Sequence, residues 1–296
     1  MIHSLHRYLL AVLLLALVPL HASAQSALIV FGDSLSDSGN NGIATSGPNT
    51  TPSSQIQGVW VMQLADQLGL PLEPSDEGGT AYARGGAVTS GMTAQVNSYL
   101  SAHPTASPTA LYVLWGGAND ITRKAEENPF DSAAIKASAT RAVANIEGQI
   151  RALARAGAKY VLWVNMPPLH KTPLAQTFPF GIGEAVIRPP TLHFNTLWVQ
   201  ALARLRSEFP GLTLGGMDVY TLYSDIVSRP SAYGLTNVTG TAKGKAVNPD
   251  KYLFWDDAHP TSAAHGILAD EAYAMIQDAT SLWESDEAWE VLPAEQ

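Results

Sequence analysis

The feature that most constrains the fold is an alternation of short, continuously apolar runs with longer segments whose apolar residues recur at helical spacing. The apolar runs cover residues 27–31, 111–115 and 160–164, and each ends at Gly, Asn or Pro. Runs of this length and character are typical of strands that are buried on both faces of a sheet. A weaker candidate strand covers residues 212–214.

Helical patterns separate these runs, over residues 55–68, 132–156, 191–209 and 262–279. The pattern over residues 132–156 is the most regular, and Gly157 follows it as a suitable C-terminal residue. Strands that alternate with helices favour a parallel sheet with helices on both faces. Because neither an internal repeat nor a long low-complexity linker divides the chain, we predict one domain.

The first 24 residues have the pattern of a secretory signal peptide rather than of a folded segment. Arg7 precedes an apolar run over residues 9–18, and Ala22-Ser23-Ala24 is a small-x-small cleavage site. The apolar run is shorter than the roughly 20 residues that cross a bilayer. We therefore expect a signal peptide over 1–24, a domain over 25–282, an acidic tail over 283–296, an exported protein in the periplasm or outside the cell, and no stable membrane anchor.

Composition narrows the classes of function. The 296 residues carry a net charge of −9 without a Lys/Arg-rich run, which argues against a nucleic acid partner. A hydrophobic content of 46% with 15% charged residues indicates a substantial core. The chain has no cysteine, so any catalysis uses oxygen or nitrogen groups.

Four short blocks contain the residue types that acyl transfer needs. The first block contains Ser34 directly after a predicted strand, and the others are Ala83-Arg84-Gly85-Gly86-Ala87, Gly116-Gly117-Ala118-Asn119-Asp120 and Trp255-Asp256-Asp257-Ala258-His259-Pro260-Thr261. They supply a hydroxyl nucleophile, an imidazole, carboxylates to orient it, and donors for an oxyanion. Because sites in open α/β sheets form at the carboxyl ends of strands, we expect these groups to meet in one crevice.

These blocks, in this order, resemble the SGNH/GDSL hydrolase family, and in particular its secreted bacterial branch of esterases and lysophospholipases. The first block reads Phe31-Gly32-Asp33-Ser34-Leu35-Ser36-Asp37-Ser38-Gly39-Asn40-Asn41, and the resemblance extends from about Ala27 to Ala279. It implies a single-domain α/β/α sandwich with a mainly parallel, flavodoxin-like sheet, and a serine esterase without cofactor or metal.

The resemblance also implies a role for each site residue. Ser34 would be the nucleophile, His259 the general base and Asp256 the carboxylate that orients the imidazole. The oxyanion hole would use the backbone N–H groups of Ser34 and Gly86 with the side-chain amide of Asn119.

Some neighbouring residues keep alternatives open. Asp257 competes with Asp256 for the role of the orienting carboxylate. Asp33 and Asp37 are expected to accept hydrogen bonds from loop N–H groups, and Asp120 to support its loop. The remaining histidines of the domain, His103, His170, His193 and His265, have no comparable setting.

The second block departs from the family pattern. An Asn commonly stands five residues before the oxyanion glycine and an apolar or small residue two before it, whereas Ala81 and Arg84 occupy these positions here. The departure leaves open how this loop is held and whether Arg84 faces solvent or substrate.

The substrate is expected to be a small-molecule or lipid ester. Residues 167–190 are rich in Pro and aromatic residues and are predicted to form a substrate-contacting loop with Phe178 and Phe180. Trp115 and Trp255 stand beside the site blocks and either contact substrate or pack in the core. A lysophospholipase or phospholipase A is the alternative within this class. A metal-dependent phosphohydrolase and a catalytically dead binding module are the alternatives of other classes.

Overall fold

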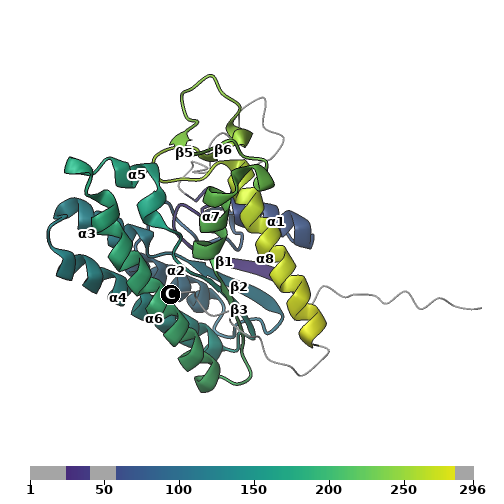
Figure 1. The fold of residues 1–296 in the computed structure, drawn as a ribbon. Helices are drawn as coiled ribbons and strands as arrows, with labels where there is room; N and C mark the ends of the chain where they lie inside the picture. The colour runs from purple at the N-terminus through teal and green to yellow at the C-terminus, as the bar shows by residue number, and fades with distance from the viewer. Residues whose placement is uncertain (1–24, 41–57, 284–296) are drawn as a thin grey trace, which may run out of the picture.

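The computed structural model describes residues 25–40 and 58–283, which form a sheet between two layers of helices (Figure 1). The predicted signal peptide over 1–24, the start of the helical pattern over 55–68 and residues 284–296 of the predicted tail lie outside the described residues. Within the described part, no helix is long and apolar enough to cross a membrane.

The central sheet has four parallel strands in the order β1-β2-β3-β4. They are β1 (Ala27–Gly32), β2 (Ala110–Trp115), β3 (Tyr160–Val164) and β4 (Thr213–Met217). The three strong strand predictions are confirmed, and the weaker one overlaps β4. The α/β fold with a parallel sheet between helices is also confirmed.

Residues 80–84 extend along the free edge of β1. The Val30 N–H donates to the Thr80 carbonyl (3.1 Å), and the Tyr82 N–H donates back to the Val30 carbonyl (2.7 Å). The Arg84 N–H continues the ladder to the Gly32 carbonyl (3.1 Å). With this segment counted as an outer strand, the order across the sheet is second, first, third, fourth and fifth, as in the flavodoxin-like arrangement.

Each strand sends alternate side chains to opposite helical layers, as strand geometry requires. Leu28 and Val30 pack toward α1 (Trp60–Leu68), α7 (Val219–Ser228) and α8 (Ser262–Trp283). Ile29 and Phe31 pack toward the other layer, which comprises α2 (Thr89–Ala102), α3 (Ala118–Glu127), α4 (Ser132–Ala156) and α6 (Gly183–Glu208). Figure 1 shows α1 and α8 on one side of the sheet and α4 and α6 on the other.

Three helix predictions differ from the structure at their ends. The pattern over 55–68 included residues 58 and 59, but α1 begins at Trp60. The α4 bounds are confirmed, but α8 continues to Trp283, one residue past the predicted domain boundary. The α6 helix begins at Gly183 instead of residue 191 and contains Pro189 and Pro190. Burial of Ile187 and Pro190 holds this turn helical although two prolines remove backbone donors.

Several short elements were not predicted, namely α2, α3, α7, the four-residue α5 (Pro173–Gln176), β5 (Asn237–Thr241) and β6 (Tyr252–Phe254). Short 3₁₀ helices also occur at Ser75–Glu77, Leu169–Lys171, Pro179–Gly181, Pro230–Tyr233 and Pro249–Lys251. The pair of strands β5 and β6 lies at one end of the molecule (Figure 1). Two of these elements begin directly after central strands: α3 follows β2, and α7 follows β4.

Candidate active site

Ser34 stands two residues after the end of β1, and the strand end is held tightly. A side chain at Gly32 would place its Cβ 2.6 Å from the Trp115 carbonyl oxygen, so only glycine fits there. The side-chain amide of Gln95, from α2, donates to the Gly32 carbonyl and accepts from the Gly32 N–H, each at 2.9 Å. These contacts hold Gly32 in place, and so they also position the turn that carries Ser34.

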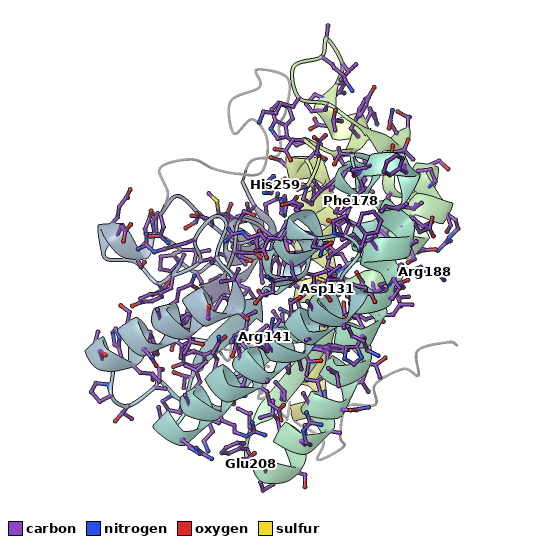
Figure 2. The ribbon with its side chains drawn as sticks, turned by 90° about the vertical axis from the view of Figure 1, so that its left-hand side faces the viewer. Asp131, Arg141, Phe178, Arg188, Glu208 and His259 are labelled. Carbon is purple, nitrogen blue, oxygen red and sulfur yellow. The ribbon has the colours of Figure 1, made fainter. Side chains whose placement is uncertain are left out.

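Ser34, His259 and Asp256 form a continuous hydrogen-bonded series. The Ser34 Oγ lies 2.9 Å from His259 Nε2, and His259 Nδ1 lies 2.8 Å from Asp256 Oδ1. Figure 2 shows His259 in the upper half of the molecule and Glu208 at its lower end. Ser34 and His259 are 225 positions apart in the chain, so the fold brings them together.

The protonation state of Asp256 determines which atoms donate in the two hydrogen bonds of the His259 ring. Burial raises the pKa of this carboxyl, but hydrogen bonds from the His259 ring and the backbone N–H groups of Ala258 and His259 outweigh it and lower the pKa to about 2. An ionised carboxylate only accepts, so Nδ1–H donates to Asp256 and Nε2 is left to accept from the Ser34 hydroxyl. The orienting carboxylate is therefore ionised at neutral pH.

Asp257 does not share this geometry. Its backbone carbonyl accepts a hydrogen bond from the Leu174 N–H at 2.8 Å, whereas the hydrogen bond to the His259 ring is formed by Asp256. The structure thus places Asp256, and not Asp257, in contact with the imidazole.

Gly86 and Asn119 line the same cavity as Ser34 and His259. Gly86 has a φ of +75°, a conformation that favours glycine, and its N–H has no acceptor among the described residues. The Asn119 side-chain N–H₂ donates to the Ala87 carbonyl at 3.0 Å and faces Asp33 Oδ2 at a longer 3.4 Å. The Gly86 N–H and the weakly bonded Asn119 hydrogen can therefore serve an oxygen of a bound substrate.

Other groups hold the second block in place of the usual Asn. The Asn40 side chain donates to the carbonyls of Ala81 (2.6 Å) and Ala83 (2.9 Å). Arg84 is half-exposed and pairs with Asp76, which raises the pKa of Arg84 and lowers the pKa of Asp76. Arg84 is thus engaged with another loop rather than with the cavity.

The acidic residues near Ser34 are engaged as predicted. Asp37 accepts from the backbone N–H groups of Gly39, Asn40 and Gly85 at 2.7–2.9 Å. Asp33 accepts from the Leu35 N–H at 3.0 Å, and Asp120 accepts from the Thr89 N–H and hydroxyl. Over residues 25–40 and 58–283, no group of three or more His, Asp or Glu residues is arranged to hold a metal ion.

The other histidines lie outside this series. His265 and His170 are buried, and burial lowers their pKa values to about 3 and about 4. His193 contacts Thr140, and His103 stacks on Tyr99. None of them hydrogen-bonds to Ser34.

A cavity of about 510 Å³ opens at Ser34 and His259. Most of its lining is apolar, including Leu35, Trp115, Leu174, Val227 and Phe254. Trp115 is both a cavity and a core residue, because its indole N–H donates to the Asn165 carbonyl (2.9 Å) and its side chain is fully buried. The cavity can accept an apolar group of an ester beside the Ser34 hydroxyl.

Three predicted substrate contacts do not lie on this cavity. Phe178 is buried in the core cluster, and Phe180 is 92% exposed on a 3₁₀ turn. Trp255 is also absent from the cavity lining. Residues 167–190 are mostly helical rather than a loop, and only their first part, from Pro167 to Leu174, lines the cavity.

Asp33 makes the stability of the fold depend on pH. Burial raises the pKa of this carboxyl to about 6, so the folded protein retains a proton that the unfolded chain releases near pH 4. Stability should therefore fall as the pH rises from about 4 through 6, by roughly 3 kcal/mol for this group. Asp33→Asn cannot ionise, so we expect its stability relative to wild type to increase over this interval, measured by urea unfolding at pH 4 and pH 8. Parallel stability profiles of the two proteins would contradict this expectation.

Sequence patterns did not point to three residues that support the site. Gln95 holds the end of β1, Asn40 holds the second block, and Arg123 donates to the Gly86 carbonyl. Gln95 and Arg123 lie on α2 and α3, which were not predicted, and a single polar residue on a helix does not reveal its partner through periodicity. Asn40 stood inside the first block, but its partners lie about 40 residues away.

The sequence of the chain is similar to curated bacterial lipases and haemolysins. The profile of the family described as GDSL-like Lipase/Acylhydrolase matches residues 28–272. "Lipase 1" of Photorhabdus luminescens is 27% identical over 86% of this chain and 51% of its own length. "Thermolabile hemolysin" of Vibrio parahaemolyticus is 26% identical over 87% of this chain and 64% of its own length. The chain thus spans about half to two thirds of the length of these relatives.

The fold is similar to that of solved esterases. An acetyl-xylooligosaccharide esterase from Geobacillus stearothermophilus superposes with a TM-score of 0.50 at 15% identity, over 85% of this chain and 94% of that one. At this identity the likeness concerns the fold alone. The family profile covers most of the chain, and the four blocks that resemble the family meet at one cavity. This chain belongs to the GDSL-like lipase/acylhydrolase family.

Proposed function

We propose that this protein is an exported serine esterase that hydrolyses carboxylic esters through an acyl-enzyme on Ser34. One observation carries the proposal: Ser34 Oγ lies 2.9 Å from His259 Nε2 while His259 Nδ1 lies 2.8 Å from Asp256. A hydroxyl, an imidazole and an ionised carboxylate in this order are the arrangement that activates serine for acyl transfer.

The first half of the proposed reaction forms the acyl-enzyme. Ser34 Oγ attacks the ester carbonyl carbon, and its proton passes to His259 Nε2. The carbonyl oxygen becomes an oxyanion, which accepts from the N–H groups of Ser34 and Gly86 and from the Asn119 amide. The intermediate then breaks its bond to the alcohol oxygen, and the imidazolium of His259 protonates the leaving alcohol.

The second half releases the acid. A water molecule gives its proton to His259 Nε2 as its oxygen attacks the acyl carbon. The second tetrahedral intermediate breaks the bond to Ser34 Oγ, which recovers the proton from the imidazolium. Asp256 stays ionised throughout and stabilises each imidazolium through Nδ1–H, so no external cofactor is required for atoms and charges to balance.

The residues that line the cavity indicate which kind of ester it can bind. Its apolar side chains Leu35, Leu174, Val227 and Phe254 suit the acyl chain of an ester. The same feature favours the second candidate, a lysophospholipase or phospholipase A activity on lipid esters. A dependence of kcat/KM on acyl length separates the two candidates, because a small-ester esterase loses rate as the chain lengthens.

Export is proposed from residues 1–24. Arg7, the apolar run 9–18 and the Ala22-Ser23-Ala24 site support cleavage after Ala24. Mass spectrometry of the protein recovered from a bacterial periplasm or medium should find Gln25 at the N-terminus. A protein retained in the cytoplasm with residues 1–24 attached would contradict export.

The proposed reaction is tested with p-nitrophenyl esters from acetate to palmitate. We expect a burst of p-nitrophenol that matches the enzyme concentration, a Ser34 peptide heavier by one acyl group, and turnover that a chelator leaves unchanged. Hydrolysis of p-nitrophenyl phosphate that a chelator abolishes would favour the metal-dependent phosphohydrolase instead. No hydrolysis of any ester would favour the binding module.

A further inference from the structure

The first turns of α3 contact the second block at two points and the start of α2 at a third. Asn119 donates to the Ala87 carbonyl (3.0 Å), and Asp120 accepts from the Thr89 N–H (2.9 Å) and hydroxyl (2.8 Å). Arg123, one turn further along α3, donates through Nη2 to the Gly86 carbonyl. One helix thus carries the Asn119 oxyanion donor and also contacts the loop that carries a second donor, the Gly86 N–H.

Arg123 contacts Gly86, whose backbone conformation determines the direction of a proposed oxyanion donor. Gly86 has a φ of +75°, and rotation about its backbone bonds would change the direction of its N–H. A Cβ at Gly86 would lie 3.1 Å from Arg123 Nη2, so the guanidinium lies directly against this residue. No acceptor for the Gly86 N–H itself occurs in the described part of the chain, so its direction depends on contacts elsewhere in the loop.

We propose that Arg123 is a positioning residue for ester hydrolysis: its hydrogen bond to the Gly86 carbonyl restricts rotation about the Gly86 backbone bonds, and so holds the Gly86 N–H toward the developing oxyanion. The proposal rests on the proposed function, in which the Gly86 N–H stabilises that oxyanion. A donor that is already oriented stabilises charge in the transition state without a reorganisation cost. Loss of the guanidinium leaves the substrate carbonyl bound but lets the Gly86 N–H sample unproductive directions.

Arg123 also lines the cavity, which raises a competing interpretation. A residue that contacts the substrate directly would change KM, and its effect would depend on the structure of the ester. A residue that positions the Gly86 N–H changes kcat by the same factor for every ester, since each forms the same oxyanion. The two interpretations therefore predict different kinetics.

The test compares three variants on p-nitrophenyl acetate and p-nitrophenyl butyrate. Arg123→Met removes the donor, Arg123→Lys retains one charged donor, and Lys124→Met removes the neighbouring charge on α3. Lys124 pairs with Glu127 and does not line the cavity. We expect Arg123→Met to lower kcat about tenfold on both esters with KM unchanged, Arg123→Lys to recover part of the loss, and Lys124→Met to match wild type.

A second readout addresses the oxyanion hole directly. An alkylphosphonate p-nitrophenyl ester reacts when Ser34 Oγ bonds to phosphorus and p-nitrophenol leaves, with the phosphoryl oxygen in the oxyanion hole. Arg123→Met should therefore slow inactivation by a factor similar to its loss in kcat. Thermal unfolding of Arg123→Met should match Lys124→Met, since Arg123 is exposed.

Each other outcome overturns the inference. A change confined to KM, or a loss that differs between the two esters, would make Arg123 a substrate contact. A wild-type kcat in Arg123→Met, or an equal loss in Lys124→Met, would remove the positioning role. Failure of the proposed function is separate, because it would appear as wild-type turnover in Ser34→Ala.

Discussion

Replacing Ser34 by alanine should lower kcat for p-nitrophenyl butyrate by about 10⁴- to 10⁶-fold. The variant has no oxygen to attack the carbonyl, so the acyl-enzyme cannot form and the burst of p-nitrophenol disappears. The oxyanion donors and the cavity remain, so a small residual rate from direct attack by water is expected. Stopped-flow absorbance at the p-nitrophenolate wavelength measures both the burst and the steady rate.

Ser38→Ala is the matched control for this experiment. Ser38 lies four residues further along the same segment, and its hydroxyl has no hydrogen-bond partner in the described structure. Its removal should leave the burst and kcat unchanged. If Ser34→Ala kept more than a tenth of the wild-type rate, Ser34 would not be the nucleophile.

Replacing Asp256 by asparagine should lower kcat by about 10⁴-fold, because an amide neither retains the negative charge nor selects the same imidazole tautomer. The amide NH₂ can donate to Nδ1, which would place the imidazole proton on Nε2 and block acceptance of the Ser34 proton. Thermal unfolding should show that the variant remains folded. Kinetics on p-nitrophenyl butyrate give the size of the loss.

Asp257→Asn makes the same chemical change at the adjacent residue. Its side chain is exposed and the imidazole contact belongs to Asp256, so kcat should stay within about twofold of wild type. Equal losses in the two variants would show that the carboxylates act together. A larger loss in Asp257→Asn would assign the orienting role to Asp257.

The strands β1, β2 and β3 and the helix α4 could be predicted because their buried positions form regular patterns of apolar residues in the sequence. β1, β2 and β3 are covered on both faces and are therefore apolar at nearly every position, and α4 alternates buried and exposed positions over 25 residues. The shorter elements do not have such a regular pattern of apolar residues. The edge segment over residues 80–84 contains Ala and Arg, and α3 begins with the polar site residues that it presents to the cavity.

The substrate contacts were the least predictable part of the site. Aromatic composition suggested Phe178 and Phe180, but Phe178 packs in the core and Phe180 points to solvent. Whether an aromatic residue lies in a core, on a surface or beside a cavity depends on the packing of several helices, and its own neighbours in sequence carry no such information. Three residues of α7 and β6 do line the cavity, namely Tyr223, Val227 and Phe254. Nothing in the sequence around them distinguishes them from residues of the core.

The sequence by itself determined the α/β class, the strand ends that carry polar groups and the identity of Ser34, His259, Gly86 and Asn119 as candidates. The class and the strand ends depend on local composition, whereas the candidate residues come from the residue types in the short blocks and from the resemblance of these blocks to the GDSL family. The tertiary structure decided which of two adjacent carboxylates contacts His259, and that Asn40, Gln95 and Arg123 hold the site. Such choices depend on distances of a few ångströms between groups far apart in the chain, and only the packed sheet and helices define those distances.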